Sequence, residues 1–143
     1  MHYFSVKMNR SDFQLLAKVR LREAKLLLAA NAADGAYYLA GYAVECALKA
    51  CIAKATKRHD FPDKQRANDS YTHNAKKLIV VAGLESALDE AVRQSEFGLR
   101  WKIVLQWNEE SRYSSHSTRD ALDLIEAVEN RKYGILQWLK KHY

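Results

Sequence analysis

Apolar residues recur every three or four positions along most of the chain, the spacing that places side chains on one face of an α-helix. Because the connections between these segments are short, the helices are expected to pack antiparallel. The pattern therefore predicts an all-α fold, an antiparallel up-and-down bundle of four to five helices. The predicted helices cover residues 11–30, 36–56, 72–82 and 85–108, and a last one runs from residue 117 almost to the C-terminus.

Cap and turn residues mark several of the predicted helix ends. Gly83 is the expected C-terminal stop of the third helix, and Ser117 with Asp120 forms a variant of the capping box that opens the last one. Residues 95–98 are the weak point of the fourth helix, where we expect a kink or a split. Residues 57–71 have no apolar periodicity and contain the chain's one proline, so they are predicted to form a polar loop.

The composition fits a single helical domain over residues 1–143. Apolar residues make up 48% and charged residues 28%, which argues against disorder, and five glycines are too few for an all-β fold. The spacing of Cys46 and Cys51 matches neither a metal site nor a disulfide framework, so we interpret both as reduced core residues. The five histidines also lack zinc-ligand spacing, and we expect no metal or other cofactor.

No segment has the pattern of a membrane span or of a signal peptide. The most apolar region, residues 26–53, is interrupted by four polar or charged side chains, too many for a bilayer span. The N-terminus lacks the apolar run of a secretory signal. Together with the reduced cysteines, these features predict a soluble cytoplasmic protein with no membrane partner.

Basic residues outnumber acidic ones, and the excess is uneven along the chain. The formal net charge is +6. Residues 54–77 hold seven basic and three acidic residues, whereas residues 85–129 hold ten acidic and five basic ones. A basic stretch of this kind binds anionic partners such as RNA in some proteins, and in others it is an ordinary solvated loop. From charge alone the solvated loop is the preferred interpretation.

One face of the second predicted helix carries the first candidate site. Tyr38, Tyr42, Glu45 and Lys49 recur at helical spacing and therefore share one side of an otherwise apolar helix. One interpretation is a routine ion pair between Glu45 and Lys49, worth about 0.2–0.5 kcal/mol. The other is a partly buried charged pair that is kept for function. The sequence leaves both interpretations open.

The second candidate site is Arg112 with His116, just before the last predicted helix. If this segment is helical, the two side chains lie one turn apart on the same side. An arginine holds a phosphate through two hydrogen bonds, and a histidine transfers protons near neutral pH. Such a pair suits metal-free RNA cleavage, in which the 2′-hydroxyl attacks the neighbouring phosphorus. The alternative is a chance pair, since this spacing near a helix start is common.

Residues 36–50 strongly resemble the second helix of prokaryotic HEPN-domain proteins (the higher eukaryotes and prokaryotes nucleotide-binding family). Weaker matches follow in the family's order, and the resemblance covers residues 12–140. It implies a compact bundle of four or five helices that pairs as a symmetric homodimer. Many members of the family are encoded beside a minimal nucleotidyltransferase and act in toxin–antitoxin pairs. The later matches are Tyr71-Thr72-His73 leading to Leu78, Trp107 with Ser111-Arg112-Tyr113, and Gln137-Trp138-Leu139.

The resemblance also leaves two hypotheses about function. Active members of the family are metal-independent ribonucleases with an arginine, four to six intervening residues and a histidine, whereas three residues separate Arg112 from His116. The Arg-Tyr sequence here resembles a subset whose members look like binding modules for RNA, a nucleotide or a partner protein.

We therefore expect a homodimeric module that binds a nucleotide or RNA and is paired with a minimal nucleotidyltransferase. The alternative is an endoribonuclease toxin, in which Arg112 holds the scissile phosphate and His116 is the general acid or base. The residues expected around the binding cleft are Tyr38, Tyr42, Glu45, Lys49 and Tyr113.

Overall fold

The computed structural model describes residues 8–57 and 68–143, and every regular element in them is a helix. The all-α prediction is thereby confirmed for these residues. The predicted polar loop at 57–71 falls largely outside them. The elements are α1 (Arg10–Ala29), α2 (Ala33–Lys57), α4 (Ala75–Val81), α5 (Glu85–Ala91), α6 (Ser95–Leu105), the 3₁₀ helix η1 (Glu109–Tyr113), α7 (Thr118–Glu129) and α8 (Ile135–Lys140).

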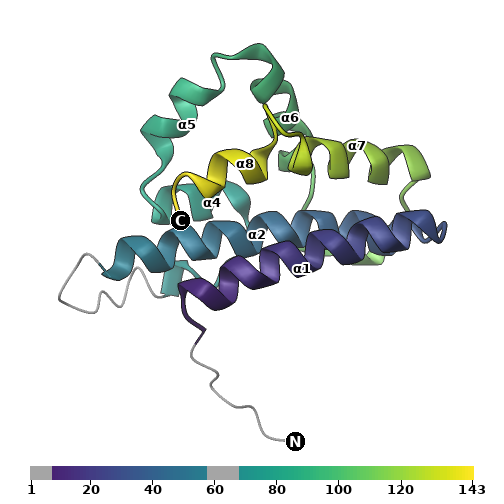
Figure 1. The fold of residues 1–143 in the computed structure, drawn as a ribbon, viewed down its shortest axis with the longest axis horizontal. Helices are drawn as coiled ribbons and strands as arrows, with labels where there is room; N and C mark the ends of the chain where they lie inside the picture. The colour runs from purple at the N-terminus through teal and green to yellow at the C-terminus, as the bar shows by residue number, and fades with distance from the viewer. Residues whose placement is uncertain (1–7, 58–67) are drawn as a thin grey trace, which may run out of the picture.

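Helices α1 and α2 form an antiparallel hairpin that is the base of the fold (Figure 1). The chain reverses at Asn31, whose φ of 63° is in the left-handed region that asparagine tolerates better than most residues. Small side chains let the two helices approach closely, and α1 buries Ala17 and Ala24 completely. In α2 the fully buried alanines form a stripe at helical spacing: Ala36, Ala40, Ala43, Ala47 and Ala50.

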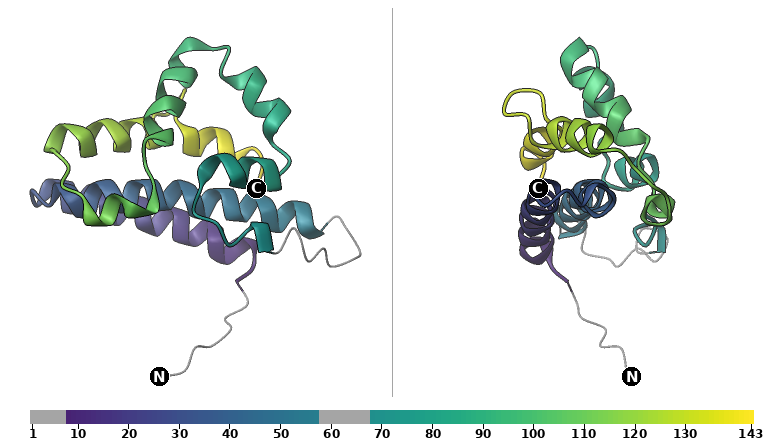
Figure 2. Two further views of the ribbon diagram at one scale, coloured as in Figure 1. Left: turned by 180° about the vertical axis from the view of Figure 1, so that it is seen from behind. Right: turned by 90° about the vertical axis from the view of Figure 1, so that its right-hand side faces the viewer.

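Three helices form a second layer on α2, and α5 and α6 lie beyond it, on the side away from α1, as the end-on view in Figure 2 shows. Helices α4, α7 and α8 pack directly against α2, while α6 packs against α7. The core lies between these helices, and α2, α4, α7 and α8 each contribute to it a leucine with no exposed surface. These leucines are Leu48, Leu78, Leu124 and Leu139.

Two of the predicted helices are each divided in the structure. The fourth is split into α5 and α6 over residues 92–94, slightly before the expected weak point at 95–98. There the side chain of Gln94 accepts hydrogen bonds from the backbone N–H groups of Glu96 and Phe97, so it caps the new helix. The split was therefore predicted, and its cause is a capping side chain.

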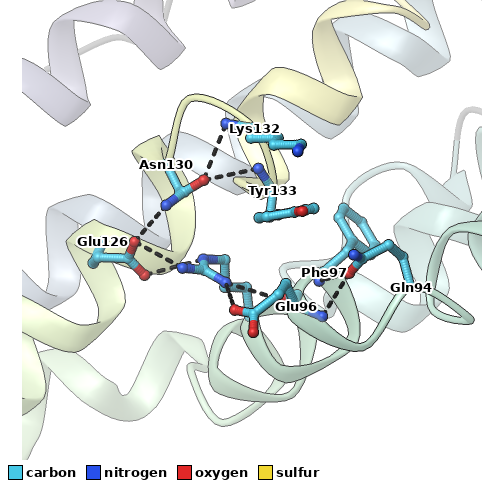
Figure 3. Close-up of polar contacts among 8 residues, drawn as sticks. Gln94, Glu96, Phe97, Glu126, Asn130, Lys132 and Tyr133 are labelled. Carbon is cyan, nitrogen blue, oxygen red and sulfur yellow. Dashed lines mark hydrogen bonds and ion pairs between the residues drawn. The ribbon is translucent and has the colours of Figure 1, made fainter.

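The prediction of one continuous helix from residue 117 almost to the C-terminus is wrong, because α7 ends at Glu129 and α8 begins at Ile135. The Oδ1 atom of Asn130 accepts hydrogen bonds from the backbone N–H groups of Lys132 and Tyr133, at 3.0 and 2.8 Å (Figure 3). This Asx-type turn competes with the helical hydrogen bonds and reverses the chain.

A partly buried arginine, Arg100, links α6 to α7. The guanidinium of Arg100 in α6 donates to both carboxylate oxygens of Glu126 in α7, at 3.1 and 3.0 Å, and also to Glu96. The same carboxylate also accepts a hydrogen bond from the side-chain amide of Asn130, at 2.7 Å (Figure 3). The hydrogen bonds from Arg100 lower the pKa of Glu126. The turn after α7 is therefore linked to α6 through one carboxylate.

The predicted capping box at the start of α7 is confirmed, and it yields a first stability prediction. Ser117 Oγ accepts from the Asp120 N–H at 3.0 Å, while Asp120 Oδ2 accepts from the Ser117 N–H at 3.2 Å. Ser117→Ala is expected to cost about 0.5–2 kcal/mol, since it leaves a helix N–H without its acceptor. The measurement is urea unfolding followed by circular dichroism. Ser115→Ala, at an exposed position outside any helix, is the matched control, and equal midpoints for the two variants would contradict the prediction.

Candidate functional site

Five ionisable side chains, in which acidic and basic residues alternate, form a continuous row from α2 to η1, and we call this set the charged row. Lys49 Nζ lies 3.2 Å from Glu45 Oε2, and His73 Nδ1 lies 2.9 Å from Glu45 Oε1. On its other side, His73 Nε2 lies 3.4 Å from Glu109 Oε1. The same oxygen of Glu109 lies 3.7 Å from Arg112 Nη2. The row thus joins α2, the segment before α4, and η1.

Glu45 is the buried centre of the charged row, with 4% of its side chain exposed. A carboxylate at this depth is retained only when hydrogen bonds and opposite charge compensate its lost hydration. Lys49, four residues on in α2, supplies the charge, and the Nδ1–H of His73 donates the second hydrogen bond. The Glu45–Lys49 pair is therefore partly buried, as the second of the two interpretations required, while a role in function stays a prediction.

The imidazole of His73 is oriented by this carboxylate. Because Glu45 occupies Nδ1, the Nε2 atom faces Glu109 at the surface. The two contacts fix the ring plane, and the Glu45 carboxylate, which only accepts, places a proton on Nδ1. Sequence reasoning did not select His73 or Glu109 as site residues. The one available signal was the Tyr71-Thr72-His73 match, which carried no assigned role.

A cleft of about 660 Å³ lies beside His73, between the segment that leads into α4 and the segment that leads into η1. Its walls mix charge of both signs with one large aromatic ring. The residues that line it are Thr72, His73, Asn74, Ala75, Lys76, Leu105, Trp107, Asn108, Glu109 and Glu110. Two members of the charged row, His73 and Glu109, therefore line a cleft large enough for a nucleotide-sized ligand.

Trp107 closes the base of this cleft. Its ring lies directly over Gly41 of α2, and Tyr38 packs against it with 5.7 Å between ring centroids. The indole Nε1–H is buried and has no acceptor among the described residues. A buried donor without a partner is rare in folded proteins, and it belongs here to a residue that also lines the cleft.

Arg112 and Tyr113 form an exposed pair at the outer end of the charged row. The Arg112 guanidinium carbon lies 4.8 Å from the centroid of the Tyr113 ring, and 77% of Tyr113 is exposed. Tyr113, followed by other neighbours that include Tyr38 and Glu109, raises the pKa of Arg112, which stays fully charged. The pair offers a flat aromatic surface and a cation, the two groups that hold bases and phosphates.

His116 does not join this pair, because the chain is not α-helical between it and Arg112. Arg112 lies in η1, and the segment after Tyr113 is extended as far as the cap of α7. The His116 ring is stacked on Tyr37, with 3.8 Å between centroids and 10° between planes, and its Nε2 lies 3.3 Å from the Ser111 carbonyl oxygen. The prediction that Arg112 and His116 lie one helical turn apart required a helical segment, and the segment between them is not an α-helix.

The tyrosines on the face of α2 are partly buried rather than open to a ligand. Tyr38 and Tyr42 lie one turn apart with their rings 6.1 Å from each other and nearly parallel. Burial raises the pKa of Tyr42. Tyr38 reaches the cleft through its contact with Trp107, whereas Tyr42 does not line the cleft.

The remaining expectations concern cysteines, metals and membranes. Cys46 and Cys51 are free and buried, as predicted, and burial raises their pKa values to about 11 and about 12. Among the residues that the structure describes, no three His, Cys, Asp or Glu side chains gather closely enough to hold a metal ion. Nor does any helix there combine the length and apolar character required to cross a bilayer.

Comparison of the chain with models of protein families, with curated proteins and with solved structures finds no match.

Proposed function

We propose that the protein is a nucleotide- or RNA-binding module of the HEPN type, in which the Arg112–Tyr113 pair and the adjoining cleft hold the ligand. The observation that carries this proposal is the exposed cation stacked on an exposed aromatic ring at the end of the charged row. A base stacks on Tyr113, and a phosphate replaces Glu109 as the partner of Arg112. The formal net charge of +6 favours an anionic ligand.

The proposal includes the finer features that the resemblance implies. The helices are those of an antiparallel up-and-down bundle of four to five helices, which pairs as a symmetric homodimer in the cytoplasm. Its partner is a minimal nucleotidyltransferase in a toxin–antitoxin-like system. A stable dimer of this kind buries more than about 1,000 Å², so light scattering that gives a monomer at working concentration would remove the dimer from the proposal.

The binding site is tested by two substitutions at exposed positions. Arg112→Ala and Tyr113→Ala are each expected to weaken binding of a labelled single-stranded RNA or a nucleoside triphosphate about tenfold, since one such contact contributes ~1–3 kcal/mol. The measurement is fluorescence anisotropy at fixed salt. Arg93→Ala is the matched control, because Arg93 is another exposed arginine in an i,i+3 pair with a glutamate. An equal loss in the control variant would show that only overall charge matters.

The second candidate is a metal-independent endoribonuclease that uses Arg112 and His116. It is less well supported, because Tyr37 covers one face of the His116 ring and Ser111 engages its Nε2. The discriminating assay incubates the protein with single-stranded RNA in EDTA. Cleavage that leaves 2′,3′-cyclic phosphate ends and is lost in both Arg112→Ala and His116→Ala would establish the ribonuclease and replace the binding module.

A further inference from the structure

A second surface, which the proposed function does not use, runs along the outer side of α1. It is a groove of about 870 Å³ between α1 on one side and α8 with Tyr143 on the other. Its lining is mainly apolar, and two leucines of α1 are open to solvent there: 61% of Leu15 and 64% of Leu26 are exposed. The other apolar lining residues are Leu21, Leu136 and Tyr143.

Among the residues that the structure describes, every charged side chain that lines this groove is basic. Lys18, Arg22 and Lys25 line it from α1, and Lys140 lines it from α8. Lys25 has an ion-pair partner outside the groove, Glu129 of α7, at 2.9 Å. Within the described residues, the other three cations make no ion pair, so their charge is available to a partner.

The leucines and cations follow one line along the helix. Leu15, Lys18, Arg22 and Leu26 are spaced by three or four residues, which places them on one face. The line extends over about 16 Å at 1.5 Å per residue. This length accommodates roughly three turns of a second helix, the geometry of helix-in-groove recognition.

We propose that this groove binds an acidic amphipathic helix of a separate protein, with its apolar side chains on Leu15 and Leu26 and its carboxylates beside Lys18, Arg22 and Lys140. The basic border of the groove favours an acidic helix over two other occupants, a second copy of this chain and an RNA. A second copy bound through the same face in a symmetric dimer would bring the cations of both copies together, which costs free energy. RNA would match the cations but leave the leucines without apolar contacts.

The experiment uses the full chain and a defined probe. The probe is a fluorescein-labelled peptide of about 18 residues, long enough for a helix, with leucines on one helical face and glutamates on both flanks. Its control is a scrambled peptide of the same composition. We expect anisotropy to show at least about tenfold tighter binding of the amphipathic peptide, since one buried leucine contributes ~1.5–3 kcal/mol.

Exposed substitutions then locate the binding surface without disturbing the core. Leu26→Ala and Arg22→Glu are each expected to weaken peptide binding about tenfold. The matched controls are Leu99→Ala and Lys102→Glu, a similarly exposed leucine and lysine on α6, which should leave binding unchanged. Arg112→Ala should also leave it unchanged, so failure of the groove and failure of the RNA-binding site are distinguishable.

Three results would overturn the proposal. The first is equal binding of the amphipathic and scrambled peptides, or of wild type and Leu26→Ala. The second is a fall in molecular mass by light scattering when Leu26 is replaced, without peptide binding by wild type, which would identify the groove as a contact between copies. The third is RNA binding that is lost in Arg22→Glu, again without peptide binding, which would assign the groove to nucleic acid.

Discussion

Gly41→Ala is expected to destabilise the folded protein by about 2 kcal/mol, the upper end of an overpacking cost less the gain in helix propensity. A Cβ atom at this position would lie 2.3 Å from three atoms of the Trp107 ring, closer than any non-bonded carbon pair allows. The ring is buried and packs against Tyr38, so it must give up contacts to make room. Overpacking of this kind costs ~1–3 kcal/mol or more, and the better helix propensity of alanine, ~1 kcal/mol, offsets part of it.

Gly35→Ala is the matched control in the same helix. There the Cβ atom would lie 3.1 Å from Leu27 Cδ1, the end of a flexible side chain that has room to rotate. Its stability is expected to stay within about 1 kcal/mol of wild type. Urea unfolding monitored by circular dichroism measures both variants. If Gly41→Ala unfolds at the same urea concentration as Gly35→Ala, the close packing of Trp107 on α2 is not what holds this part of the core.

Glu45→Ala is expected to lower the free energy of unfolding by about 2–4 kcal/mol. The substitution leaves Lys49, whose side chain is 18% exposed, with its charge in a low-dielectric environment and without a counter-ion. Breaking a buried pair costs ~3–5 kcal/mol, and the partial exposure of Lys49 and His73 reduces this figure. The charged row also loses its centre, so His73 is no longer oriented.

The control for this prediction is Glu90→Ala, which removes one partner of an ion pair with Arg93 that is exposed on both sides. Its expected cost is at most about 0.5 kcal/mol. The double variant Glu45→Ala/Lys49→Ala separates burial from pairing. If Lys49 is stranded by the loss of Glu45, the second substitution restores part of the stability. If Glu45→Ala and Glu90→Ala lower the free energy of unfolding equally, the burial of Glu45 does not contribute to stability.

The parts of the fold that local sequence determines were predictable. Apolar spacing located α1 and α2 to within a few residues, and Gly83 has the positive φ of 73° expected of a helix stop. The break between α7 and α8 was missed because apolar residues keep their helical spacing across it. Its cause is a single side chain, Asn130, that accepts backbone hydrogen bonds.

The site was predictable only where its residues share one helix. Glu45 and Lys49 lie four residues apart in α2, so periodicity was sufficient to pair them. The contact between Glu45 and His73 spans 28 residues of chain, and no local pattern indicates which side chains meet across that distance. The same reason explains His116, whose place is set by Tyr37 on a distant helix. The relationship to HEPN-domain proteins remains a prediction.

His116 ties the segment that carries Arg112 and Tyr113 to the first turn of α2. Its backbone N–H donates to Asp34 Oδ1 at 2.6 Å, and its ring lies on Tyr37, so the first turn of α2 anchors one end of the segment that carries Arg112 and Tyr113. Glu109, through its contact with His73, anchors the other end. A short loop held at both ends has few conformations to lose, so binding of the proposed ligand there would cost little ordering entropy. If the proposed function holds, Asp34 and Tyr37 would therefore raise affinity through the unbound state of the protein.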